Sequence, residues 1–165
     1  MLKDYQKKIL ELLEQLELEM AGLYKLFANK FSSRGDLWIA LAQEETGHAD
    51  KVKKLRSFID EGKAAFDEKM TKTYTVQLFI DNIKKVYTDA QTNNMPLLKA
   101  LALSYDFEQS IIEKKLYDYF ISSDSDVKII INDIREDTSN HSSKIKKIME
   151  EEKQGMGKPV WQALR

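Results

Sequence analysis

The sequence predicts an all-α protein, built as a four-helix bundle with a long crossover that contains an additional short helix. Apolar side chains recur at helical spacing through most of the 165 residues, and the two prolines and six glycines leave few interruptions. These interruptions divide the long helices into two hairpins with tight turns, joined by a crossover of about 35 residues. Tight turns make antiparallel neighbours, whereas a long crossover lets the two hairpins pack together.

The first two predicted helices span residues 3–31 and 36–61. One face of the first carries Ile9, Leu12, Leu13, Leu16, Met20, Leu23, Tyr24, Phe27 and Phe31. Residues 32–35 interrupt this pattern, and Asp36 is the expected N-cap of the second helix. The second helix carries Leu37, Ile39, Leu41, Val52, Leu55 and Phe58 and ends before Gly62.

The crossover and the second hairpin follow. Residues 63–74 are ambiguous, and residues 75–93 are predicted to form the short helix. Pro96 suits a first helical turn and opens a third long helix over about residues 96–121, with Leu97, Leu101, Tyr105, Ile112, Leu116 and Tyr119 along it. A fourth long helix is predicted over about residues 125–153. It includes Ile129–Ile131, a β-branched run that is too short and isolated to pair as a strand.

The bundle is therefore assigned to residues 1–153, and residues 154–165 to a C-terminal tail. In that tail Val160 and Trp161 are expected to dock on the bundle or on another subunit.

The net charge is −1 with acids and bases interleaved, which gives no reason to expect nucleic acid as a partner. No apolar run approaches the roughly 20 residues that span a bilayer, so no membrane partner is expected. The chain has no cysteine, and cytoplasm is the default location.

The most informative segment is Glu45-Thr46-Gly47-His48, because the chain has only two histidines. A carboxylate and an imidazole three residues apart stand on one helical face. That face also carries Leu41 and Val52, so the pair is expected to point inward. Gly47 is interpreted as room for a neighbouring helix, and Glu44 is expected to point elsewhere, by about 100°. The alternative is a surface glutamate beside a core histidine.

Each of the other long helices carries one comparable group. Glu17 lies on the inward face of the first helix, with Glu14 and Glu19 as alternatives. Glu108 and His141 lie on the apolar faces of the third and fourth helices. Each of these groups alone is more simply explained as structural. Together they place an acid or an imidazole near the middle of every long helix, so they are expected to meet in one buried layer.

These residues resemble a known family. Glu17 followed by Tyr24, then Glu45-Thr46-Gly47-His48-Ala49, then Glu108 and His141, is similar to the rubrerythrin-type di-iron proteins of the ferritin-like superfamily. The resemblance covers about residues 5–150. It implies a ferritin-like bundle that holds two iron ions, bridged by glutamates and capped by two histidines. The implied ligands are Glu17, Glu45, His48, Glu108 and His141, and this donor set also suits manganese or zinc.

The sequence departs from the family pattern in three ways. Thr138 stands where the family has a glutamate three residues before the last histidine, and Asp137 is a candidate substitute ligand. Tyr105 stands where the peroxidases of the family carry a second glutamate. No cysteine-rich electron-transfer module is present, so turnover would need a separate electron donor. The resemblance further implies peroxide or oxygen as oxidant, and a homodimer.

Three functions follow from these observations. The first is a non-haem di-iron oxidoreductase of the rubrerythrin type. The second is an iron-binding or iron-handling bundle with little turnover, because Thr138 leaves the ligand set incomplete. The third is a metal-free helical scaffold with vestigial ligands. In the first two, Tyr24 and Tyr105 are candidate hydrogen-bond donors to the ligands; otherwise they are core tyrosines.

Overall fold

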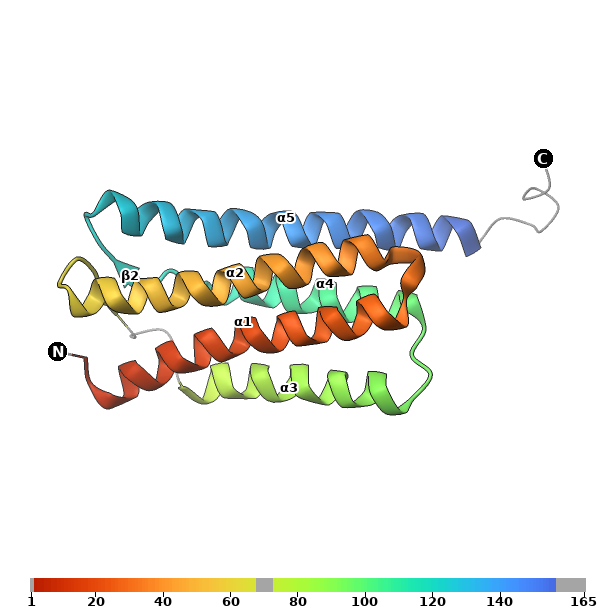
Figure 1. The fold of residues 1–165 in the computed structure, drawn as a ribbon, viewed down its shortest axis with the longest axis horizontal. Coiled ribbons are helices and arrows are strands. Elements are labelled where there is room, and N and C mark those ends of the chain that lie inside the picture. Colours follow the sequence, from red (N-terminus) through yellow and green to blue (C-terminus); the bar gives the residue numbers. More distant parts are fainter. Residues whose placement is uncertain (1, 68–72, 157–165) are drawn as a thin grey trace.

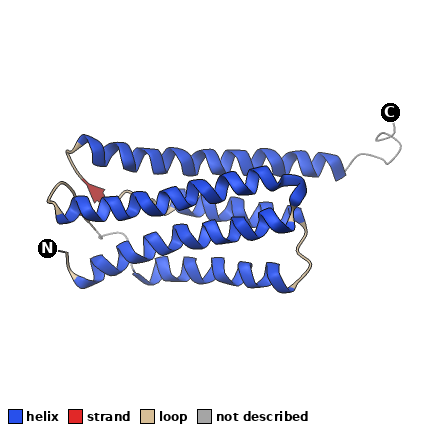
Figure 2. Ribbon diagram, viewed as in Figure 1, coloured by secondary structure: helices blue, strands red, loops and turns tan. Residues whose placement is uncertain are grey.

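The computed structural model describes residues 2–67 and 73–156, and this part of the chain is all-α, as predicted (Figures 1 and 2). Its helices are α1 (Asp4–Lys30), α2 (Gly35–Asp60), α3 (Thr73–Thr92), α4 (Leu97–Glu113) and α5 (Ser125–Met156). A 3-10 turn, Ser32–Arg34, joins α1 to α2. Two short strands, β1 (Ala65–Phe66) and β2 (Phe120–Ile121), pair antiparallel.

The helices lie roughly parallel to one long axis, and each runs opposite to the one before it in the chain (Figure 1). Contacts join α1 to α2, α4 to α5, and α2 to α5, while α3 packs along α1. Because α3 runs antiparallel to α2, it returns the chain toward the end where α2 began (Figure 1). As a result α2 and α4 point in the same direction (Figure 1).

The core is continuous between the helices and contains large aromatic side chains. Trp38 is fully buried, and its ring lies 5.7 Å from that of Tyr24 and 5.0 Å from that of Phe27, measured between centroids. At the same end of the molecule, Arg34 Nη2 lies 2.7 Å from Glu152 Oε1, which ties the α1–α2 turn to the end of α5. The aromatic contacts join α1 to α2, and the ion pair holds the end of α5 against this hairpin.

The third long helix is shorter than predicted. It ends at Glu113, not near residue 121, and Lys115 adopts a left-handed backbone with φ of 50°. The apolar residues beyond it were interpreted as a helical face, but Leu116, Tyr117, Tyr119 and Phe120 are all buried. Burial at this spacing also fits one face of a helix, as Ile9, Leu10, Leu12 and Leu13 of α1 show, so the sequence pattern does not distinguish a turn from a helix here. The segment instead turns across the bundle and pairs with β1.

Other differences are local. Helix α2 begins at Gly35, so Asp36 lies in its first turn and is not the N-cap. Ile39 and Ile112, counted with the apolar faces, are exposed at 49% and 38%. Helix α5 includes the predicted run Ile129–Ile131 and continues to Met156, beyond the predicted end at 153. The rest of the tail, with Val160 and Trp161, lies outside the described residues. None of the described helices combines the length and the hydrophobicity that crossing a bilayer requires.

Candidate metal centre

Five ligand-type side chains meet in the middle of the molecule. Helix α1 provides Glu17, α2 provides Glu45 and His48, α4 provides Glu108 and α5 provides His141. Each is at most 1% exposed. Burying three carboxylates and two imidazoles together is costly unless they are paired with one another or bound to a cation. The sequence predicted that these same five residues would meet in one buried layer.

Helical geometry accounts for the pair on α2. Glu45 and His48 are three residues apart, and the flanking Leu41 and Val52 are both 1% exposed, so one face of α2 carries all four inward. Gly47 does not have the role expected of it. A Cβ atom at this position would meet nothing within 4 Å, so no neighbouring helix approaches it closely.

Glu17, Glu45 and His48 form the first of two groups that could hold a metal ion. His48 Nδ1 lies 2.9 Å from Glu45 Oε2 and 3.8 Å from Glu17 Oε2. The candidate ligand atoms of this group all lie within 4.8 Å of one another. A single cation could therefore contact all three side chains after small movements.

The second group consists of Glu45, Glu108 and His141. His141 Nδ1 lies 2.9 Å from Glu45 Oε1 and 3.5 Å from Glu108 Oε1. Glu45 thus belongs to both groups and turns one carboxylate oxygen toward each histidine. The two imidazole rings stack at 5.5 Å between centroids. This is the arrangement expected of a carboxylate that bridges two metal ions.

The hydrogen bonding of this cluster is incomplete. Glu45 Oε1, Glu108 Oε2 and His141 Nδ1 are buried and have no hydrogen-bond partner among the described residues. Glu45 Oε1 and His141 Nδ1 are close, but they are not aligned for a hydrogen bond. A buried polar atom without a partner costs about 1–3 kcal/mol. The unpaired atoms are the ones a metal ion would coordinate, so the residues present fit a metal.

The titration of the cluster is strongly shifted. Burial and the negative charges of Glu108 and Glu17 raise the pKa of Glu45 to about 8. Burial alone would lower the pKa of His48, but its contacts with Glu17 and Glu45 outweigh burial and raise that pKa to about 10. His141 behaves in the same way through Glu108 and Glu45, and its pKa rises to about 11. Protons therefore neutralise this cluster, and a divalent metal would displace them.

Two tyrosines support the carboxylates. The Tyr24 hydroxyl donates to Glu108 Oε1 at 2.5 Å, and the Tyr117 hydroxyl donates to Glu17 Oε1. Burial and the nearby carboxylates raise the pKa of both phenols well above the usual value, so both remain donors. Tyr24 was a predicted donor. Tyr117 was missed, because it lies in the turn that was taken for helix. No hydrogen bond joins Tyr105, the other predicted donor, to any described residue of the cluster.

The outer nitrogen of each histidine faces a second carboxylate. His141 Nε2 contacts Glu44 Oε2, and His48 Nε2 lies 3.1 Å from Asp137 Oδ2. Glu44 was expected to point away from the site; its side chain instead reaches the edge of the His141 ring. Asp137 contacts the nitrogen of His48 that faces away from Glu17 and Glu45, and it belongs to neither ligand group. Such outer carboxylates orient a histidine and leave its other nitrogen free to bind metal.

Thr138 leaves a gap in the ligand set. It is 4% exposed, and its hydroxyl donates to the backbone oxygen of Ile134 at 2.8 Å. It is therefore turned into the protein but brings no carboxylate to the cluster. No other described carboxylate takes part in the two ligand groups, so three glutamates and two histidines make up the set.

Comparison with protein-family models, with curated proteins and with solved structures finds no match to this chain. Fold and site together define an all-α protein with two overlapping clusters of buried glutamate and histidine that could hold metal ions.

Proposed function

We propose that this protein is a ferritin-like di-metal protein of the rubrerythrin type, a non-haem oxidoreductase that reacts with peroxide or oxygen. The observation that carries the proposal is the sharing of Glu45 between two buried ligand groups, each completed by one glutamate and one histidine. A site with these two halves accommodates two ions side by side with one carboxylate between them.

The path of the chain supports the ferritin-like part of the proposal. In such bundles a long crossover joins two antiparallel hairpins, so the second and third long helices point the same way. Here α2 and α4 point the same way, and the crossover carries α3 along the molecule (Figure 1). The ligands come from α1, α2, α4 and α5, that is, from both hairpins, as in di-metal carboxylate bundles.

Each residue of the site has a defined task in this proposal. Glu17 and His48 would hold one ion, Glu108 and His141 the other, and Glu45 both. Iron or manganese bound there would exchange electrons with the oxidant, whereas zinc would fit the ligands but has no redox chemistry. The protein keeps the ligands aligned and excludes bulk water with its apolar core. The electrons come from a separate donor, and a homodimer is the proposed assembly.

A second function is favoured by Thr138. Because no carboxylate stands at this position, the centre has one fewer anionic ligand than the family pattern. A site with fewer anionic ligands stabilises an oxidised metal less well. The second candidate is therefore a bundle that binds or handles iron with little turnover.

Anaerobic loading with ferrous iron, followed by metal analysis, tests the proposal. We expect about two iron ions per chain in the wild type. Because Glu45 serves both ions, Glu45→Gln should lose both, whereas the exposed control Glu11→Gln should keep both. A wild-type protein that retains no metal would instead be the metal-free scaffold.

Mixing the iron-loaded protein with peroxide separates the first two functions. An oxidoreductase reoxidises its iron faster than free ferrous ion reacts under the same conditions, and a donor restores it for a second cycle. Iron that binds but reoxidises no faster than the free ion would favour the iron-handling function.

A further inference from the structure

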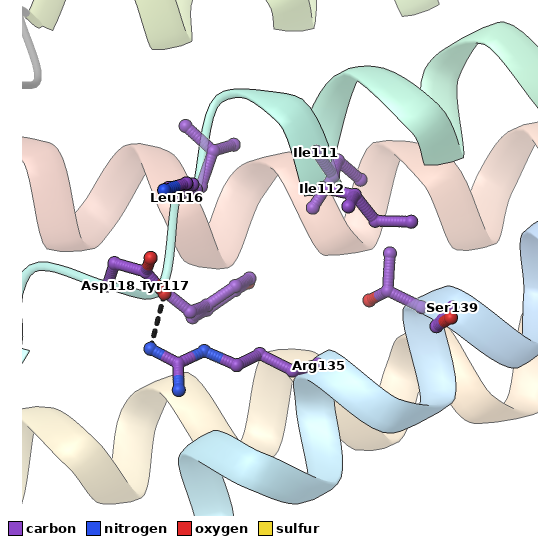
Figure 3. A pocket seen from close by; sticks show the side chains of 9 residues that line it. Ile111, Ile112, Leu116, Tyr117, Asp118, Arg135 and Ser139 are labelled. Carbon is purple, nitrogen blue, oxygen red and sulfur yellow. Dashed lines mark hydrogen bonds and ion pairs between the residues drawn. The ribbon is translucent and has the colours of Figure 1, made fainter.

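A cavity of about 390 Å³ lies between the end of α4, the turn that follows it, and α5 (Figure 3). Small-molecule sites usually have volumes of roughly 300–1,000 Å³. The side chains of Ile111 and Ile112 lie across the cavity from those of Arg135 and Ser139 (Figure 3). Neither the metal ligands nor their outer carboxylates line it, so its role is distinct from that of the ligand cluster.

The floor of the cavity is apolar and adjoins the metal centre. The buried lining residues are Ile111, Leu116, Tyr117 and Thr138. The Tyr117 hydroxyl donates to Glu17, and Thr138 lies one helical turn before His141. A molecule on this floor would therefore be separated from the ligands by single side chains.

The mouth of the cavity carries an excess of positive charge. Its charged residues are Lys115, Asp118 and Arg135. Arg135 pairs with Asp118, whereas no ion pair joins Lys115 to a described residue. Lys115 also has a φ of 50°, a left-handed conformation normally taken by glycine after the end of a helix. The unpaired Lys115 therefore lies at the mouth of the cavity, close to the exposed Ile112. It occupies a position where glycine would fit the backbone better.

We propose that this cavity binds a small monocarboxylic acid with an apolar body. The carboxylate lies at the mouth against Lys115, and the apolar body reaches the floor formed by Tyr117 and Thr138. Such a ligand satisfies both features of the cavity: it covers the exposed Ile112 and it pairs the free cation. The claim that the acid lies beside bound metal rests on the proposed function, whereas the claim that the acid binds does not.

The experiment is a calorimetric titration of the full-length, metal-free protein with octanoate and, separately, with octan-1-ol. We expect one octanoate per chain, bound about tenfold more tightly than the alcohol, because only the acid gains a charged hydrogen bond. Equal affinity for acid and alcohol, or no binding of octanoate, would overturn the proposal.

Two variants locate the ligand without disturbing the core. Ser139 is an exposed lining residue, so Ser139→Phe should fill the mouth and abolish binding, whereas the neighbouring exposed control Asn140→Phe should not. Lys115→Asn removes the charge but tolerates the left-handed backbone, and should weaken octanoate about tenfold. The exposed control Lys147→Asn should bind as the wild type does. Octanoate binding that survives both Ser139→Phe and Lys115→Asn would place the acid elsewhere and overturn the proposal.

Cobalt(II) loading tests the proximity of the acid to the metal centre. Octanoate should shift the visible absorption bands of the bound cobalt in the wild type and leave them unchanged in Ser139→Phe. If the cobalt absorption bands of the wild type do not shift when octanoate binds, the acid does not lie beside the metal centre. If no cobalt binds, the proposed function fails, while the metal-free titrations still decide whether the cavity is an acid site.

Discussion

Glu45 presents its two carboxylate oxygens to different histidines. Its Oε2 lies 2.9 Å from His48 Nδ1, and its Oε1 lies 2.9 Å from His141 Nδ1. Each histidine in turn has its outer nitrogen against a second carboxylate, which is Asp137 for His48 and Glu44 for His141. Both imidazoles are therefore held from outside, with Nδ1 turned toward the centre. The site thus has inner carboxylates that could bind metal and outer carboxylates that contact the far side of each imidazole.

The difference between inner and outer groups can be measured. His48→Ala removes an inner donor and should lower metal affinity far more than Glu44→Gln, which removes only the charge beside His141. Loss of an outer partner typically costs about 10–100-fold in metal affinity. Competition with a chelator of known affinity gives both values. Asp137→Asn should behave like Glu44→Gln, since Asp137 also lies on an outer nitrogen.

Equal losses for His48→Ala and Glu44→Gln would show that the inner and outer assignments are wrong. A complete loss of one metal ion in Asp137→Asn would show that Asp137 is itself a ligand, as the sequence had suggested.

Tyr117 gives a second prediction at the residue scale. Tyr117→Phe removes the hydroxyl that donates to Glu17 Oε1 and leaves a buried carboxylate oxygen with one donor fewer. The free energy of unfolding of the metal-free protein should fall by about 1–3 kcal/mol. Urea denaturation measures this change. Tyr105→Phe is the matched control and should have little effect, because no hydrogen bond joins the Tyr105 hydroxyl to a described residue of the centre.

At the scale of elements, the end of α4 is as important as its middle. Helix α4 stops at Glu113, and the left-handed Lys115 directs the chain across the bundle. The turn then delivers Tyr117 to Glu17 on α1, and β2 pairs with β1 from the crossover. A helix that continued to residue 121 would carry Tyr117 away along α4, and the turn residues that line the cavity would no longer cross the bundle.

The backbone at this turn is strained, and relieving it should stabilise the fold. Lys115→Gly keeps the left-handed conformation without a Cβ clash and should raise the free energy of unfolding by about 1 kcal/mol. Lys114, with φ of −77°, is the matched control, and Lys114→Gly should bring no gain. Urea denaturation compares the two. A destabilised Lys115→Gly would mean that the lysine side chain contributes more to the turn than its backbone costs.

At the scale of the whole molecule, much of the arrangement follows from the sequence. The inward orientation of Glu45 and His48 could be predicted because both lie on an apolar helical face, where residue spacing determines which way a side chain points. Tyr117 and the cavity could not, since helical periodicity carries no information about a turn. Glu44 lies about a third of the way round α2 from Glu45, yet it reaches His141 because its side chain is long and α5 packs against α2. The spacing of residues within one helix does not predict where a neighbouring helix will lie.

The buried charges make the stability of the whole metal-free protein depend on pH. The folded state raises the pKa of His48 from 6.5 to about 10 and that of Glu45 from 4.5 to about 8. Between the unfolded and folded pKa of each group, the folded protein binds more protons than the unfolded chain does. Its stability therefore falls as pH rises through this range. Urea midpoints of the metal-free protein should decrease steadily from pH 6.5 to pH 9.5.

Metal reverses this dependence, because the ligands bind metal in their deprotonated forms. The loaded protein should gain stability relative to the metal-free protein as pH rises over the same range. Parallel pH profiles for the loaded and metal-free forms would show that the metal binds away from these groups.

The central feature of the proposed site is that this layer holds two ions. Anomalous diffraction at the iron edge, from crystals of protein loaded anaerobically with ferrous iron, tests it directly. We predict two peaks about 3.5–4 Å apart, one among Glu17, Glu45 and His48 and the other among Glu45, Glu108 and His141. A single peak away from Glu45, or no peak within this layer, would contradict the account.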